Sequence, residues 1–287
     1  MRVHTDCQQP EADRYEADRA RGKRTVSQHR RPYPCADVGA FTGAIERSQR
    51  GVLLIPPDRA SVLKGEIGSF KRVVWSDPIA LHQIRSIGSR YGATINDVLV
   101  AAVAGALRRY LQRRGDPVDE GVLRTLVPVN LRPAGEPAGL GNHFSLVYLS
   151  LPVSLAEPEE RILAIKERMT LLKHSPEPFV TYQVLNVLGL LPGQLAAQAA
   201  GMFTGKATAV LTNVPGPRKT LYLAGRPIGR ILFWVPQSGQ IGMGISIISY
   251  AGGVTVGIMV DEKLAPDAEA LIHCFAAEVA ALTDALN

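Results

Sequence analysis

Hydrophobic positions recur with a helical period in two stretches between residues 79 and 115. The first stretch follows a strand predicted over Lys71–Ser76. Asp77-Pro78 favours a helix start, because aspartate caps helices and proline fits the first turn, and Gly92 favours the helix end. The apolar residues that share one face of this helix are Ile79, Ile84, Ile87 and Tyr91. We therefore expect a strand followed by an amphipathic helix.

The second helical stretch begins at Thr94. Its hydroxyl is placed to accept a hydrogen bond from the backbone N–H of Asp97, whose carboxylate can reach back, which gives a Thr-x-x-Asp variant of the capping box. Gly115 ends the pattern. The apolar stripe of this helix consists of Ile95, Val98, Leu99, Ala102, Val103, Ala106, Leu107 and Tyr110. A stripe of this width predicts a helix that buries most of its length.

Residues rich in Val, Leu, Phe and Tyr then predict two strands, Leu123–Asn130 and Asn142–Val153. The Gly/Pro-rich segment Pro133–Gly141 between them reads as a loop, and such a loop is suited to lie beside a ligand.

Three helices are expected next, over Ala156–Lys173, Val180–Leu190 and Gly193–Phe203, with Pro192 separating the last two. The last two are unusually apolar. We interpret them as core helices; the alternatives are that they line a channel for long acyl chains or rest on a lipid surface.

Alternating and continuous apolar runs dominate the last third of the chain and indicate strands. The predicted strands are Ala207–Thr212, Leu221–Ala224, Pro227–Val235, Ile241–Tyr250 and Val254–Val260. Short turns such as Gly252-Gly253 favour an antiparallel meander, and a closing helix over Pro266–Leu286 is expected to cover one face. The predicted fold is therefore α+β, with a mixed or largely antiparallel sheet covered by helices.

Composition separates the beginning of the chain from the rest. The 287 residues are 46% hydrophobic and 20% charged, as in an ordinary globular protein. The segment Arg19–Arg31 carries six basic and no acidic residues, so we expect residues 1–60 to be a poorly structured basic segment and residues 61–287 to form the folded domain. A phosphate-binding arm is the alternative for the basic segment. The net charge of +6 is compatible with an anionic partner, but without a basic helix or an RNA-binding aromatic pattern we expect no nucleic acid.

The cysteines and the apolar runs bear on location. Cys7, Cys35 and Cys274 match no metal or redox spacing, which favours a reducing cytoplasm and predicts no metal site. The sequence has no secretory signal and no apolar run near the roughly 18 residues that span a bilayer. Any membrane contact is therefore expected to be peripheral.

Seven short motifs follow one another in a distinctive order. They are Gly92–Val98, Ala104–Leu111, Val127–Arg132, Leu140–Asn142, Thr212–Pro217, Gly242-x-Gly244 and Ser249-Tyr250-x-Gly252. In this order and spacing, the chain from about Ser61 resembles the C-terminal half of the bacterial wax ester synthase/diacylglycerol acyltransferase family. The resemblance implies half of a chloramphenicol acetyltransferase-like fold. It also implies O-acyl transfer from acyl-CoA, a substrate rather than a cofactor, to diacylglycerol or a long-chain alcohol, as in triacylglycerol and wax ester synthesis.

The catalytic motif of that family is missing from this sequence. Family members carry HHxxxDG in an N-terminal half, where the second histidine is the general base, and none of the six histidines here is adjacent to another. We therefore expect little or no activity of the isolated chain, unless a separate N-terminal half supplies the base. The alternatives are a non-catalytic acyl-CoA- or lipid-binding subunit and a degenerate remnant. His143 as a replacement base is less favoured than a core or edge histidine.

The resemblance selects candidates for the substrate tunnel but assigns no catalytic residue. The candidates are Asn96, Asp97, Asn142, Asn213, Pro215, Gly216, Gly242, Gly244, Ser249 and Tyr250. For Asn96 and Asp97 we favour a scaffold role, with Asp97 as a helix cap, over contact with substrate. The stiff turn Asn213–Pro217 either holds Asn213 toward the acyl donor or only redirects the chain. We interpret Gly242 and Gly244 as strand glycines that permit close backbone approach.

Overall fold

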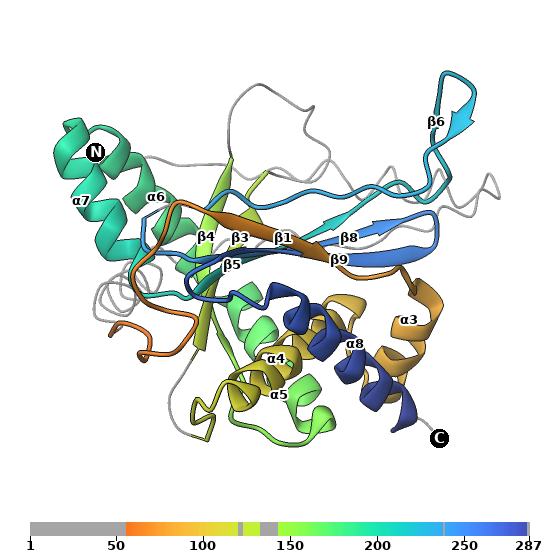
Figure 1. The fold of residues 1–287 in the computed structure, drawn as a ribbon. Helices are drawn as coiled ribbons and strands as arrows, with labels where there is room; N and C mark the ends of the chain where they lie inside the picture. The colour runs from red at the N-terminus through yellow and green to blue at the C-terminus, as the bar shows by residue number, and fades with distance from the viewer. Residues whose placement is uncertain (1–55, 120–122, 133–142, 238, 286–287) are drawn as a thin grey trace, which may run out of the picture. The chain divides into compact units, whose positions relative to one another are not determined.

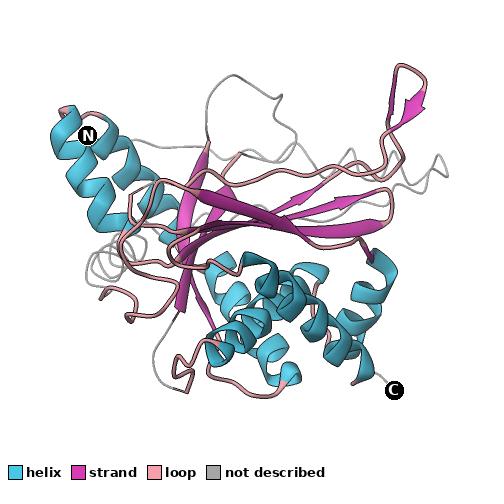
Figure 2. Ribbon diagram, viewed as in Figure 1, coloured by secondary structure: helices cyan, strands magenta, loops and turns pink. Residues whose placement is uncertain are grey.

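A mixed sheet with helices packed on one face organises this chain (Figures 1 and 2). The structure is a computed structural model, and it describes residues 56–119, 123–132, 143–237 and 239–285. These residues all belong to the larger of the chain's two compact units, residues 37–287. The expected basic segment, residues 1–60, lies almost wholly outside the described residues, as do Asn142 and the loop Pro133–Gly141, so those expectations stay predictions.

The main sheet has seven strands among the described residues. Its order is β1-β9-β8-β5-β3-β4, and β2 pairs with β9 beside β1. The strands are β1 (Lys71–Trp75), β2 (Ile79–Ala80), β3 (Leu123–Asn130), β4 (Phe144–Leu151), β5 (Ala209–Pro215), β8 (Met243–Tyr250) and β9 (Gly253–Asp261). A separate hairpin consists of β6 (Tyr222–Leu223) and β7 (Arg226–Pro227). The α+β class with a mixed sheet is confirmed.

The expected antiparallel meander is wrong for β5, which runs parallel to both of its neighbours, β3 and β8. Parallel neighbours need a connection of a dozen or more residues. Residues 216–242 provide it between β5 and β8, and they carry the β6–β7 hairpin on the way. Within the main sheet, β8 and β9 form an expected antiparallel hairpin, joined by the tight turn at Gly252.

One face of the sheet is covered by four helices, α3, α4, α5 and α8, which gather below the strands in Figure 1. The helices are α3 (Leu81–Arg90), α4 (Ile95–Arg113), α5 (Pro158–His174), α6 (Glu177–Gly189), α7 (Gly193–Thr204) and α8 (Ala268–Asp284). Apolar side chains of alternate strand positions, such as Ile245 and Val256, meet the stripe of α4 in the main core. Burial of this face is the main source of stability in such a layered fold.

The pair α6–α7 lies on the other side of the sheet, next to β4. Val180 and Thr181 of α6 are buried, and the rings of Tyr148 and Phe203 pack with centroids 5.0 Å apart at the end of α7. From residue 186 to residue 202 no side chain is buried. The interpretation of α6 and α7 as ordinary core helices is therefore wrong, since only their two ends near the sheet are packed.

Two other expectations from local pattern are wrong. The helix expected from Asp77-Pro78 begins at Leu81, because Ile79 and Ala80 pair with β9 as strand β2. The backbone N–H of Ser76 donates to Val256, so the chain continues along β9 before it turns into α3. Tertiary pairing thus outweighs the local capping signal.

The strand expected over Pro227–Val235 is also absent: beyond β7, residues 228–237 form no ladder. This segment lies across the outer face of β8 and β9 instead of pairing with an edge. The Ser246 hydroxyl donates to the carbonyl oxygen of Phe233 at 2.6 Å, and the Gln237 side chain donates to the carbonyl oxygen of Met259 at 2.7 Å. Its apolar residues are therefore covered by face contacts, which periodicity cannot distinguish from a strand.

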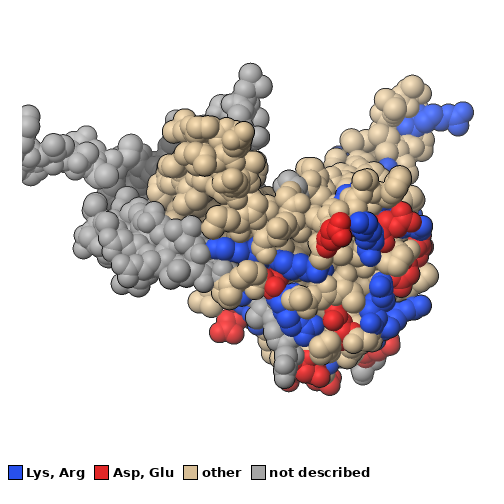
Figure 3. All heavy atoms as spheres, turned by 60° about the vertical axis from the view of Figure 1, so that its left-hand side comes forward, with Lys and Arg blue, Asp and Glu red and all other residues tan. Residues whose placement is uncertain are grey.

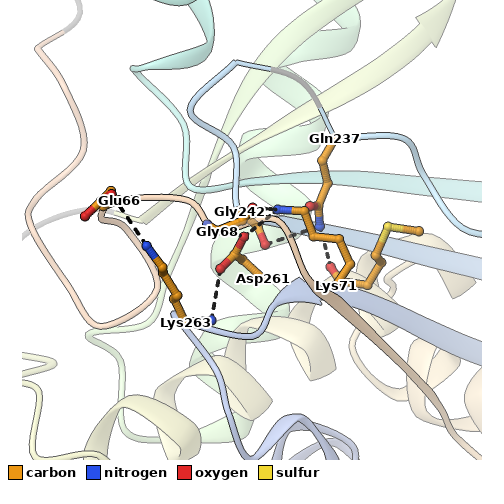
Figure 4. A network of polar contacts seen from close by, with 8 residues as sticks. Glu66, Gly68, Lys71, Gln237, Gly242, Asp261 and Lys263 are labelled. Atoms are coloured by element: carbon orange, nitrogen blue, oxygen red, sulfur yellow. Dashed lines mark hydrogen bonds and ion pairs between the residues drawn. The ribbon is translucent and has the colours of Figure 1, made fainter.

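A buried carboxylate at the end of β9 joins the segments around it (Figure 4). Asp261 accepts hydrogen bonds from the backbone N–H groups of Gly68, at 2.8 Å, and Lys263, at 3.0 Å, and from the ammonium group of Lys71. Burial by itself raises the pKa of Asp261, but the hydrogen bonds from Lys71, Lys263 and Gly68 together outweigh it and hold the pKa below its usual value.

Replacing this carboxylate is expected to give a pH-dependent loss of stability. A lowered folded-state pKa contributes stability that is present above the unfolded pKa of about 3.9 and is lost as the pH falls through the folded value. Asp261→Asn should therefore lower the free energy of unfolding by about 1.5–3 kcal/mol at about pH 7, with a smaller difference near pH 3. Urea unfolding at both pH values measures this. Glu262→Gln, which removes an exposed ion pair with Arg72, is the control, and equal losses in the two variants would contradict the prediction.

Candidate functional site

Three chain segments meet where the parallel strands β5 and β8 end. The register pairs Asn213 with Ile247 and Pro215 with Ser249, so the two carboxyl ends lie side by side. The N-terminus of α4 reaches the same place, because the Asn213 side-chain Nδ2 donates to Asn96 Oδ1 at 2.8 Å. The carboxyl ends of parallel strands are common ligand sites. We call this group of segments the strand-end site.

Asp97 holds the α4 terminus of the strand-end site. The backbone N–H of Thr94 donates to Asp97 Oδ2 at 2.8 Å, and the backbone N–H of Asp97 donates to the Thr94 hydroxyl at 3.2 Å. The capping box predicted from the sequence is confirmed. Asp97 is buried, and its Oδ1 has no hydrogen-bond partner within the described residues. The cap fixes the first turn of α4, and Asn96 in that turn contacts Asn213 of β5.

The turn after β5 is held tightly against β8. The backbone N–H of Gly216 donates to the Ser249 hydroxyl at 3.2 Å, and a Cβ on Gly216 would lie 2.2 Å from the carbonyl oxygen of Ser249. The Tyr250 hydroxyl accepts from Leu221 N and donates to Ile228 O, both at 2.8 Å. Ser249 and Tyr250 therefore orient the turn and the foot of the β6–β7 hairpin.

Gly242 and Gly244 are not brought to the strand-end site, since they lie at the opposite end of β8. A Cβ on Gly244 would lie 2.8 Å from the carbonyl oxygen of Val235, and one on Gly242 would lie 2.2 Å from Leu264 Cδ1. The expectation of a strand glycine with a close backbone neighbour is confirmed for Gly244, whereas Gly242 precedes β8 and its close neighbour is a side chain. Of the other candidates, Asn142 lies outside the described residues.

The described histidines do not hydrogen-bond to the strand-end site. His143 is exposed at the start of β4, and its ring stacks on Tyr182 of α6 with centroids 6.4 Å apart. His174 lies on α5, where its ring contacts the carbonyl oxygen of Thr170. Among the residues that the structure describes, no cluster of His, Cys, Asp and Glu side chains is arranged to hold a metal ion.

Sequence reasoning missed a buried polar cluster at the other end of the sheet. Asp58 accepts from the backbone N–H of Arg124 at 2.7 Å and from the Thr208 hydroxyl at 2.8 Å, and burial raises the pKa of Asp58. The Lys64 ammonium donates to the carbonyl oxygen of Ala207 at 3.2 Å, and burial lowers its pKa. A cavity of ≈ 440 Å³ adjoins Asp58 and Lys64. The residues of this cluster are far apart in sequence, so no local motif predicts it.

The fold defines the class of protein. A wax ester synthase/diacylglycerol acyltransferase from Marinobacter aquaeolei is similar with a TM-score of 0.59 at 22% identity, over 89% of this chain and 57% of that chain. The EpoB cyclization-docking bidomain of a nonribosomal peptide synthetase from Sorangium cellulosum is similar with a TM-score of 0.57 at 16% identity, over 85% and 49% of the two chains. The chain therefore has the architecture of a chloramphenicol acetyltransferase-like half.

Sequence comparison narrows the class to a family. The WS/DGAT C-terminal domain family matches residues 140–283, and the chain belongs to this family. A probable diacylglycerol O-acyltransferase from Mycobacterium tuberculosis is 30% identical over 214 residues, 73% of this chain and 46% of the relative. A second relative from that organism, also named as a diacylglycerol O-acyltransferase, is 32% identical over 267 residues, 85% and 53% of the two chains. The chain thus spans about half the length of these relatives.

Proposed function

We propose that this chain forms the C-terminal wall of an acyl-CoA-dependent O-acyltransferase that acylates diacylglycerol or a long-chain alcohol. The general base comes from a separate N-terminal half that carries HHxxxDG. The observation that supports this function most strongly is the hydrogen bond between Asn96 and Asn213, which joins two family motifs at the carboxyl ends of β5 and β8. The membership of the WS/DGAT family supports the reaction class.

The chemistry explains why two halves are needed. Attack of an alcohol on a thioester forms a C–O bond while a base accepts the hydroxyl proton, and a positioned base contributes about 10²–10⁴ in rate. The negative charge that develops on the thioester oxygen is stabilised by fixed N–H donors. In this proposal the carboxamides of Asn96 and Asn213 lie beside the thioester oxygen. The second histidine of HHxxxDG reaches the hydroxyl group from the N-terminal half.

The β6–β7 hairpin is the proposed contact with that half. It stands away from the main sheet (Figure 1), and Leu223 at its tip is 72% exposed. Its foot is tied by Tyr250 to the turn that follows Asn213. A partner that covers the exposed apolar residues of this hairpin, Leu221, Tyr222 and Leu223, would lie next to the strand-end site.

The isolated chain is expected to bind acyl-CoA without turnover. Isothermal titration calorimetry with palmitoyl-CoA measures binding, and release of free CoA in the presence of diacylglycerol measures turnover. Asn213→Ala should weaken binding, because it removes the side chain that holds Asn96 beside β5. Thr220→Ala, on the exposed connection after the turn, is the control for nonspecific effects. Robust turnover by the purified chain would refute the proposal.

A second candidate function is a non-catalytic acyl-CoA- or lipid-binding subunit. The bonds at the strand-end site, from Asn213 to Asn96 and within the Thr94–Asp97 cap, involve no catalytic base, so the site fits a binding role as well as the first proposal. Binding of acyl-CoA that persists while an HHxxxDG-bearing half brings no turnover would support this candidate. A chain that binds no acyl-CoA at all would fit a degenerate remnant.

A further inference from the structure

The α6–α7 helical hairpin exposes an apolar surface that the fold does not use. Leu190 is 86% exposed, Met202 74% and Val187 60%. These residues lie on both helices and at the turn between them. The packed ends of the hairpin, Val180 and Phe203, hold it on β4, so the exposed part is carried on a fixed base.

Beyond its first residue, Glu177, the same hairpin carries no charge. From Pro178 to Gly205 the sequence contains no Asp, Glu, Lys, Arg or His. Figure 3 shows the hairpin surface without charged side chains, while Lys and Arg side chains lie at its foot. The basic residues nearest the hairpin in sequence or by contact are Lys173, Lys206 and Lys64, whose ammonium donates to the carbonyl oxygen of Ala207 just beyond α7.

This distribution matches a lipid surface better than a protein partner. Protein interfaces surround an apolar centre with a polar and charged rim, whereas residues 178–205, which include the Leu190-Leu191-Pro192 turn, carry no charge. The acidic residue of the hairpin, Glu177, is the first residue of α6 and lies against β4, where the backbone N–H of Tyr148 donates to it at 3.3 Å. An interfacial element combines apolar residues that enter the acyl region with basic residues at the level of the headgroups. None of the helices in the described part of the chain qualifies as a membrane span.

We propose that the α6–α7 hairpin docks the chain on an anionic lipid surface, with the turn at Leu190 in the acyl region and the basic foot at the headgroups. The inference rests on the proposed function in one respect: diacylglycerol and long-chain alcohols reside in lipid. A docked hairpin would hold the chain where its acceptor is concentrated.

Flotation of the full chain with vesicles tests the docking. Binding is expected on phosphatidylcholine vesicles that contain phosphatidylglycerol, and it should weaken on pure phosphatidylcholine and with added salt. The double variant Leu190→Gln/Leu195→Gln, at the turn and in the first turn of α7, should lower the partition coefficient by at least about tenfold. Leu223→Gln removes a similarly exposed leucine from the β6–β7 hairpin and should leave the coefficient unchanged. Equal thermal unfolding of all variants shows that they are folded.

Fluorescence quenching at a chosen position distinguishes docking through the α6–α7 hairpin from nonspecific adsorption to vesicles. The two native tryptophans are first replaced by Trp75→Phe and Trp234→Phe. In that background, tryptophan placed by Leu190→Trp should be quenched by brominated phosphatidylcholine in the same vesicles, and tryptophan placed by Leu223→Trp should not. Absence of wild-type flotation, equal flotation of the double variant, or quenching only at position 223 would each overturn the proposal. So would a double variant that only converts a dimer into a monomer. Because these measurements use neither acyl-CoA nor a second half, they can fail while the proposed acyl transfer succeeds, and the reverse.

Discussion

O-acyl transfer is expected to rise by about 10²–10⁴ when this chain is co-expressed with an HHxxxDG-bearing N-terminal half. The half comes from a family member whose sequence contains this motif. The Mycobacterium tuberculosis relative that is 32% identical over 267 residues is the first to inspect for it, because that alignment covers 85% of the chain. The reason is that the added half brings the proton acceptor, while this chain contributes the strand-end site. Release of CoA from palmitoyl-CoA in the presence of diacylglycerol measures the rate.

Two variants test whether the restored rate comes from the proposed arrangement. Replacing the second histidine of the added motif by alanine should return the rate to that of the chain alone. Asn213→Ala in this chain should lower the restored rate by about tenfold or more, since it removes the side chain that fixes Asn96 at the α4 terminus. Thr220→Ala, on the exposed connection, should not change it. A restored rate that survives Asn213→Ala would show that this carboxamide is only architecture.

Contact between the two halves is tested in the same preparation. Leu223→Gln should weaken co-purification of the halves, because it places a polar amide in the proposed apolar contact. The turnover at saturating concentrations of the added half should be affected much less. If Leu223→Gln changes neither property, the β6–β7 hairpin is not the contact.

The sequence predicted the elements whose signals are local. The Thr94–Asp97 capping box and the apolar stripe of α4 follow from neighbouring residues, and both are present. The hairpin at Gly252 was likewise predictable, because a tight turn fixes its two strands. Family motifs added the fold class, since their order carries information that none of them has alone.

The errors arise where distant contacts decide. Nothing in residues 209–215 shows that β5 pairs in parallel, and the partner positions of Ile79 and Ala80 on β9 are invisible from Asp77-Pro78. The prediction that α6 and α7 are core helices was wrong for a similar reason, because an apolar helix has the same composition whether it is buried or exposed. At the strand-end site the sequence supplied both asparagines, but only the fold shows that Asn96 and Asn213 touch.

Helices α4, α5 and α8 enclose a cluster of charged side chains around the buried carboxylate of Glu278. Glu278 of α8 accepts a hydrogen bond from Arg109 of α4 at 2.8 Å and another from Arg161 of α5. Arg161 is only 2% exposed and also donates to the carbonyl oxygen of Leu155 at 2.7 Å. A Cβ on Gly105 of α4 would lie 2.2 Å from the carboxylate carbon of Glu278, so α4 and α8 approach closely at this glycine.

Glu278→Ala is expected to lower the free energy of unfolding by about 3–5 kcal/mol, because it leaves the Arg161 guanidinium buried without its counter-ion. Urea unfolding followed by circular dichroism measures the change. Glu269→Ala, on an exposed position of the same helix where the carboxylate lies 3.9 Å from Arg72, should change stability by less than about 1 kcal/mol. The strand-end site is formed by α4 and β5, so the loss should appear in stability before it appears in acyl-CoA binding.

The double variant Arg161→Leu/Glu278→Leu distinguishes two contributions to the free energy of unfolding: the loss caused by one buried, unpaired charge and the net contribution of the ion pair. A buried ion pair replaced by apolar residues is often neutral or stabilising, whereas breaking it from one side is not. The double variant should therefore be more stable than Glu278→Ala by at least about 1 kcal/mol. In a double-mutant cycle, the stability losses of the single variants Arg161→Leu and Glu278→Leu should be strongly non-additive. Additive losses would mean that Glu278 contributes through packing on Gly105, and the cluster would then be a matter of shape rather than charge.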